Sequence, residues 1–151
     1  MTSYAILFTM AAIGVSETIY LIHTRIENEK PICPIGGGCD LVLKSKYNNI
    51  FGVYNDLLGL LFYLSALFLT GFLVIFEQTV GGLVGMVDIS TFVFRILLIS
   101  IAGGTLMSLI LIFIQWKVIK TWCFWCLMSA CTIFVMAITI TIQFMKLVDD
   151  L

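Results

Sequence analysis

The chain has 151 residues, of which 61% are hydrophobic and 11% are charged, and its formal net charge is −1. Its mean hydropathy is +1.12, so its apolar surface far exceeds what one small core could bury. An ordinary water-soluble domain is therefore excluded, and the sequence predicts a protein of the lipid bilayer.

Four apolar stretches are long enough to cross a bilayer, which takes about 20 residues in a helix. They are 4–22, 57–76, 96–116 and 121–145. Each is predicted to be helical, because an isolated strand or irregular backbone would expose unpaired amides to lipid. The expected fold is an all-α membrane protein, a four-transmembrane-helix bundle that forms a single domain over residues 1–151.

The first stretch contains Glu17, the only charged residue inside the four stretches. A carboxyl group in a membrane span is costly and therefore suggests a function. The alternative is structural, since this side chain can also hydrogen-bond inside the bundle or extend toward the interface near His23.

The segment after the first stretch, residues 23–56, is the longest polar part of the chain. Prolines and glycines at 31–38 predict a turn-rich, mobile loop in which Cys33 and Cys39 can either form a bridge or separate. Apolar and polar side chains are interleaved over 41–51, which predicts a short amphipathic helix lying in the membrane interface.

The second connection, residues 77–95, contains three glycines and no candidate chemistry, so we interpret it as a plain turn. The last stretch opens with Cys123-Phe124-Trp125-Cys126. If a helix starts here, its N-terminal field lowers the pKa of the Cys123 thiol. Cys126 lies one turn deeper and is expected to face the interior of the bundle.

Four spans place both termini on one side, and the connections alternate between the two sides of the membrane, so the first and third share a side whichever way the protein is inserted. Both cysteine pairs therefore share a face, which indicates a dithiol relay. Electrons would pass from a reduced substrate to Cys33 and Cys39, then to Cys123, and from Cys126 to an oxidant dissolved in the lipid. A tetrathiolate zinc site is the alternative use of two such pairs, although a mobile loop beside a membrane span favours exchange.

Together these features resemble the vitamin K epoxide reductase (VKOR) family in its short prokaryotic form. The resemblance rests on the Cys-x5-Cys spacing, on a serine six residues later, on the segment that opens the second span, and on the Cys-x-x-Cys at the head of the fourth helix: Cys33, Cys39, Ser45, Asn55, Cys123 and Cys126. It implies that Asn55 donates a hydrogen bond to a quinone carbonyl and that Ser45 assists catalysis in the loop. Trp125, between the cysteines, is a candidate wall of the quinone pocket.

This chain departs from the family pattern at two points, which change the quinone and the thiol partner that we expect. The vertebrate enzymes carry a tyrosine four residues after the second active-site cysteine, where this chain has Ala130; this favours a simpler quinone, ubiquinone or menaquinone, over vitamin K epoxide. Many prokaryotic relatives carry a fused thioredoxin-like domain, whereas this chain stops at Leu151. We therefore expect a separate thioredoxin-like thiol protein as partner, with no metal and no nucleic acid.

The resemblance implies a quinone-dependent, disulfide-forming membrane oxidoreductase. One alternative is DsbB, which does the same overall chemistry on a similar frame, but its Cys-x-x-Cys lies in the first loop and its wider pair in the second. The other alternative is a non-enzymatic four-helix membrane protein whose disulfides are structural.

The distribution of basic residues and the family resemblance indicate opposite directions of insertion into the membrane. Six basic residues lie on the cysteine face and two on the other: Arg25, Lys30, Lys44, Lys46, Lys117 and Lys120, against Arg95 and Lys146. The positive-inside rule thus points the cysteines to the cytosol. The family resemblance instead implies the oxidising, extracytoplasmic face of the inner or plasma membrane. We expect the extracytoplasmic face, with inverted insertion as the alternative.

Overall fold

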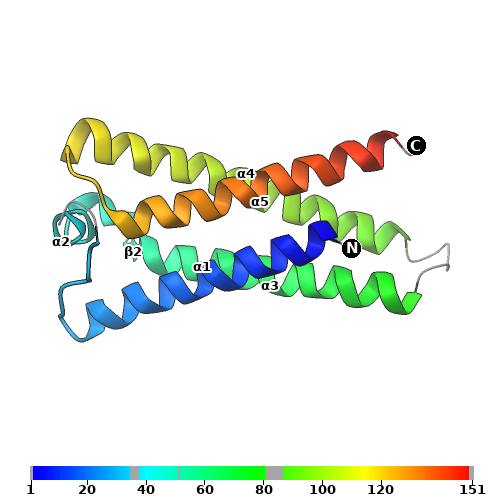
Figure 1. The fold of residues 1–151 in the computed structure, drawn as a ribbon, viewed down its shortest axis with the longest axis horizontal. Coiled ribbons are helices and arrows are strands. Elements are labelled where there is room, and N and C mark those ends of the chain that lie inside the picture. Colours follow the sequence, from blue (N-terminus) through cyan, green and yellow to red (C-terminus); the bar gives the residue numbers. More distant parts are fainter. Residues whose placement is uncertain (1, 35–37, 51, 81–86, 150–151) are drawn as a thin grey trace.

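The computed structural model describes residues 2–34, 38–50, 52–80 and 87–149, and its main elements are four long helices (Figure 1). These are α1 (Thr2–Ile26), α3 (Asn55–Val80), α4 (Val87–Ile114) and α5 (Phe124–Asp149). All four are long and apolar enough to cross a membrane. The prediction of an all-α, four-helix integral membrane protein is confirmed.

The helices pack side by side, with α1 against α3 and α5, and α4 against α5 and α3. Their contacts bury a group of residues that we call the apolar cluster: Leu7, Ala11, Tyr63, Ala66, Leu73, Phe94, Leu97, Ile101, Met136 and Ile140. Large apolar side chains also cover the outside, including Phe68 and Ile99, which are 73% and 71% exposed. An outer surface of this kind is stable in lipid rather than in water.

The helices extend beyond the apolar stretches that predicted them. α3 continues to Val80 and α4 already begins at Val87, so the predicted connection over 77–95 is too long. The hydrophobic pattern marks the part of a helix that lies in lipid, whereas the backbone hydrogen bonds continue into the interface. The glycines of this predicted turn, at positions 81, 82 and 85, lie outside the described residues.

The connection between α4 and α5 is also different from the prediction. A π-helical turn, η3 (Gln115–Ile119), follows α4, and Lys120 then adopts a left-handed conformation with φ of 54°. The last helix therefore begins at Phe124, three residues later than expected. This shift leaves Cys123 just before the first helical residue.

The loop between α1 and α3 contains the expected short helix, but this helix covers only Cys39–Leu43 (α2). Further along the segment predicted to be helical, Lys46–Asn48 form a 3-10 turn (η1) and Asn49–Ile50 form β1, which pairs with β2 (Val53–Tyr54) in a small hairpin. Phe51, the last residue of that segment, lies outside the described residues. Gly52 has a φ of 84°, a conformation that favours glycine, and it therefore allows the chain to turn back here.

The two ends of the bundle differ in what they contain. Figure 1 shows α2 and β2 at one end, beside the last turns of α1 and the start of α5, while both chain termini lie toward the other end. The loop cysteines and the Cys-x-x-Cys segment therefore lie at the same end of the molecule.

Candidate active site

The four paired cysteines meet in one place. Cys39 and Cys123 are fully buried, Val42 beside them is nearly so, and Cys33 and Cys126 pack against them; we call this group the cysteine cluster. Cys33 and Cys39 form a disulfide with their Cα atoms 6.2 Å apart, whereas Cys123 and Cys126 are free thiols. A bonded pair and a reduced pair thus lie side by side.

The loop is attached to the helices at the residue before Cys33. The Ile32 N–H donates to the Tyr20 hydroxyl at 3.2 Å, and the Ile32 carbonyl accepts a hydrogen bond from Trp125 Nε1 at 2.9 Å. The rings of Tyr20 and Trp125 pack with centroids 4.6 Å apart. Because Trp125 separates the two free cysteines in sequence, these contacts hold the loop disulfide over the Cys-x-x-Cys segment.

A glycine permits the same close approach on the other side of the disulfide. Gly38 directly precedes Cys39, and a Cβ at this position would overlap the Thr121 methyl group and lie 3.0 Å from the Trp122 carbonyl oxygen. The loop backbone can therefore lie against the residues just before Cys123 only if residue 38 has no side chain.

Cys123 occupies the N-terminal cap of α5. Its carbonyl accepts the Leu127 N–H at 3.1 Å, and its own N–H donates to Gln115 Oε1 at 3.1 Å. A hydrogen bond from the Cys126 thiol lowers the pKa of Cys123 to about 7, while burial opposes this shift and the backbone N–H groups of Cys126 and Trp125 add to it. The first cysteine of the motif is therefore the one whose thiolate forms more easily.

Cys126 lines a cavity of about 360 Å³ between the four helices. Most of the cavity wall is apolar, and a few polar side chains point to it, among them Glu17, Asn55 and Ser129. A concave, mainly apolar site with a small number of polar groups is typical of sites for small organic ligands. Its size and its lining fit the ring of a quinone.

The comparison with protein families finds one match that covers most of the chain. The model of the vitamin K epoxide reductase family matches residues 5–141. The chain belongs to this family. A comparison with curated proteins finds no match. Membership makes the chain an oxidoreductase and links it to quinones and thiols.

The VKOR residues expected from the sequence fall into two groups. Cys126, Asn55 and Trp125 line the cavity, and Ala130, which stands where the vertebrate enzymes have tyrosine, lines it too. Ser45 lies in the loop, where its hydroxyl donates to the Val42 carbonyl at 2.7 Å. Ser45 thus fixes the turn that follows α2.

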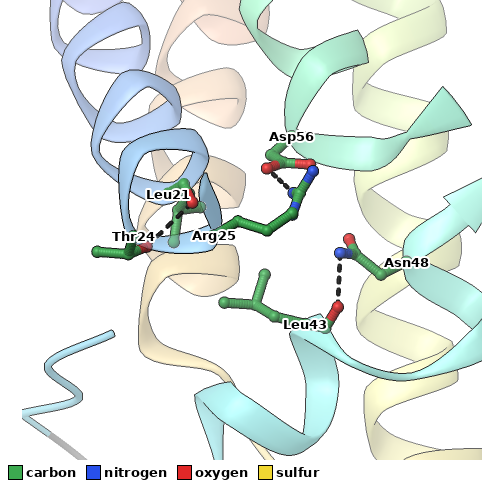
Figure 2. Close-up of polar contacts among 6 residues, drawn as sticks. All are labelled: Leu21, Thr24, Arg25, Leu43, Asn48 and Asp56. Carbon is green, nitrogen blue, oxygen red and sulfur yellow. Dashed lines mark hydrogen bonds and ion pairs between the residues drawn. The ribbon is translucent and has the colours of Figure 1, made fainter. Parts of the chain in front are cut away.

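An ion pair between the buried Asp56, which lines the cavity, and the partly buried Arg25 was not predicted. Arg25, at the end of α1, pairs with Asp56 in the first turn of α3, and Figure 2 shows the two side chains meeting between the helices. Arg25 also lies 4.0 Å from the centre of the Tyr54 ring. Asp56 directly follows Asn55, so the pair fixes the start of α3 where that amide is presented. The sequence did contain an indication of this pair, because Arg25 and Asp56 are opposite charges at the end of one span and the start of the next.

Other polar residues at this end were also missed. Figure 2 shows the Asn48 amide, which donates to the Leu43 carbonyl at 2.7 Å and closes the turn beyond α2. Gln115, which bonds both cysteines of the Cys-x-x-Cys, is the last polar residue before the aromatic end of the third span. An amide in an apolar stretch so close to the Cys-x-x-Cys could have been recognised from the sequence as a candidate partner of these cysteines.

Within the described ranges, no group of three histidine, cysteine, aspartate or glutamate side chains could hold a metal ion.

Proposed function

We propose that this protein passes electrons from a reduced thioredoxin-like protein through Cys33/Cys39 and Cys123/Cys126 to a membrane quinone, and so generates disulfides. One observation carries the proposal: Cys39 and Cys123 are buried in the same cluster, and Cys126, one turn from Cys123, lines the cavity. A thiol relay needs this kind of continuous path, because each exchange requires contact between sulfur atoms.

The two loop cysteines take different roles in this proposal. Cys33 is the less buried one and meets the protein partner, while Cys39 faces Cys123. A dithiol of the partner reduces the loop disulfide and is itself oxidised. The loop dithiol then attacks a Cys123–Cys126 disulfide, which restores the loop disulfide and leaves two thiols on α5. The observed state, with the loop pair bonded and the other pair free, is the product of that second exchange.

The last transfer takes place at the cavity. A quinone in the cavity, where Cys126 lines the wall, would be the two-electron acceptor. The Cys123 thiolate and the Cys126 thiol form the S–S bond as the Cys126 S–H bond breaks; the two electrons and this proton pass to the quinone, and a second proton completes the hydroquinone. Asn55 donates a hydrogen bond to one quinone carbonyl, and Trp125 closes the wall beside the cysteines. Ser45 contributes by holding the loop turn.

The proposed site faces the extracytoplasmic side of the inner or plasma membrane, where disulfides persist. The thiol partner is a separate protein, and the acceptor is ubiquinone or menaquinone. Fusing a compartment-specific reporter to the C-terminus tests the orientation, since both termini lie opposite the cysteine face. Reporter activity on the cytosolic side is the expected result.

The reaction is tested with purified protein, a reduced thioredoxin-like protein and decylubiquinone, by following hydroquinone formation and loss of partner thiols together. We expect both in equal amounts, since two thiols supply the two electrons. Replacing Cys33 and Cys39 together by serine should stop oxidation of the protein partner. The matched control is Cys131→Ser, which changes an exposed cysteine deeper in α5.

The alternatives predict different results. A protein with structural disulfides would give no quinone-dependent oxidation. A relay arranged as in DsbB differs by position instead, since its Cys-x-x-Cys lies in the first loop and its wider pair in the second, the reverse of Cys33/Cys39 and Cys123/Cys126 in this chain.

A further inference from the structure

Glu17 is a buried acid that the relay described above does not use. It lies on α1, is only 7% exposed, and lines the same cavity as Cys126. Its Oε2 atom is buried and has no hydrogen-bond partner in the described part of the chain. A buried polar atom without a partner is expensive, more so inside a membrane, and calls for a ligand or a function.

The charges around Glu17 favour its neutral form. No lysine, arginine or histidine occurs among the described residues that line the cavity. Arg25, two turns further along α1, is already paired with Asp56. A carboxylate without a cation is strongly disfavoured in such surroundings, whereas a protonated carboxyl group can stay there as a hydrogen-bond donor.

The neighbouring polar side chains already have partners. The Tyr63 hydroxyl bonds the carbonyl and the hydroxyl of Ser129, at 3.0 and 2.8 Å. The Thr18 hydroxyl donates to the Gly14 carbonyl at 2.8 Å. Of Glu17, Thr18, Tyr63 and Ser129, Glu17 is therefore the one that a ligand can still use as a hydrogen-bond donor.

Glu17 lies deeper in the bundle than Asn55. Helices α1 and α3 are in close contact at two levels. Gly59 of α3 lies against Thr18 of α1, since a Cβ on Gly59 would be 3.2 Å from the Thr18 methyl group. Gly14 of α1 lies against Tyr63 of α3, since a Cβ on Gly14 would overlap the Tyr63 ring. Glu17 is thus level with the segment between Gly59 and Tyr63, one to two turns below Asn55, or about 6–12 Å along the helix. A para-quinone has its two carbonyl oxygens at opposite ends of the ring, so the two side chains can reach different oxygens.

We propose that Glu17 is the proton donor to the quinone oxygen that lies away from Asn55. This inference rests on the proposed function and adds the origin of one proton. The Cys123 thiolate and the Cys126 thiol form a disulfide and give up two electrons and one proton. Glu17 supplies the second proton, so that the quinone leaves as hydroquinone and Glu17 as a carboxylate. Water then restores the proton on Glu17.

The test compares Glu17→Gln, which keeps the shape but has no acidic proton, with Glu29→Gln, the same change in the exposed loop. Decylubiquinone binding is measured by quenching of tryptophan fluorescence, and turnover by hydroquinone formation. We expect Glu17→Gln to bind the quinone within about twofold of wild type and to lower kcat about 10²-fold. Glu29→Gln should match wild type in both.

Infrared difference spectra give a readout that does not depend on turnover. The wild type should show the carbonyl band of a protonated carboxylic acid that shifts in D2O and disappears in Glu17→Gln. Glu17→Asp, which keeps an acid on a shorter side chain, should recover part of the lost kcat, and it replaces Glu17→Gln in the kinetic comparison should that variant misfold.

The possible failures are distinguishable. A wild-type protein that produces no hydroquinone would overturn the proposed function, and the donor role with it. Wild-type kcat in Glu17→Gln, or absence of the infrared band from the wild type, would overturn the role of Glu17 alone.

Discussion

The two ends of the bundle bury different kinds of side chain between their helices. The apolar cluster fills its end with aliphatic and aromatic side chains such as Leu7 and Leu97. The other end contains the cysteine cluster, the cavity and most of the buried polar side chains: Glu17, Thr18, Thr24, Asn48, Asp56 and Gln115. The remaining buried polar residues, Thr70 and Thr132, donate their hydroxyls to carbonyls one turn back in their own helices.

This difference separates stability from chemistry. Lipid-embedded helices associate by close packing, which the apolar cluster supplies with one polar group, the hydroxyl of Tyr63, where the cluster borders the cavity. Polar and ionisable side chains in a membrane are expensive, so a concentration of them at one end indicates a site. Substitutions at the cysteine end should therefore change the reaction more than the stability, and substitutions in the apolar cluster should do the opposite.

The largest effect is expected from Cys126→Ala. This sulfur lines the cavity, and without it the electron pair has no route to the quinone. Hydroquinone formation should fall to background, while a mixed disulfide between Cys123 and a loop cysteine accumulates and is visible by mass spectrometry. Full quinone turnover in this variant would mean that another sulfur meets the acceptor.

A smaller loss is expected from Asn55→Ala. A hydrogen bond to the quinone carbonyl strengthens as negative charge develops on that oxygen, so removing the amide slows the reaction as well as weakening binding. Turnover of decylubiquinone should fall at least about tenfold. If Asn55 only caps α3, the variant should keep wild-type turnover and lose about 1 kcal/mol of stability. Measuring turnover and unfolding on the same sample separates the two roles.

The sequence predicted the four helices and the shared face of the cysteines, because both follow from long apolar stretches and from the alternation of their connections across the membrane. It did not predict the hairpin beyond α2, since alternation over a few interfacial residues does not distinguish a short helix from strands. The Arg25–Asp56 pair and the Tyr63–Ser129 bonds join residues far apart in the chain. Such contacts depend on how helices face one another, which hydropathy does not specify.

The reactivity of Cys123, in the cysteine cluster, should depend on pH. Its pKa is lowered to about 7, so the thiolate is the main form above that pH and is protonated as the pH falls through it. Alkylation of Cys123 by iodoacetamide should therefore reach a plateau above about pH 7 and slow about tenfold for each unit below it. Since the Cys126 thiol is the main cause of the shift, Cys126→Ala should move the profile to higher pH. A profile that stays in place would assign the shift to the helix terminus instead.

Trp125→Phe should have a modest effect. It removes the hydrogen bond from Nε1 to the Ile32 carbonyl and keeps an aromatic ring against Tyr20. One such bond is worth about 1 kcal/mol, which corresponds to about fivefold in the equilibrium constant between the docked and the undocked loop. Oxidation of the protein partner should slow by at most that factor, whereas quinone binding by the isolated protein changes less. Phe124→Leu, next to it, serves as a control that leaves the bond intact.

The smallest effect on the reaction should come from the apolar cluster, where the largest effect on stability is expected. Leu97 is fully buried on α4, and Leu97→Ala leaves a cavity that costs about 2–5 kcal/mol because neighbouring side chains relax only in part. Leu106→Ala makes the same change on the outer surface of α4, where the side chain is 61% exposed, and should cost much less. Unfolding in mixed detergent measures both losses of stability.

At a temperature where Leu97→Ala is still folded, its kcat with decylubiquinone should equal that of wild type, because no residue of the cysteine cluster has moved. A loss of kcat in the folded variant would show that the two ends are coupled, and the separation drawn between them would not hold.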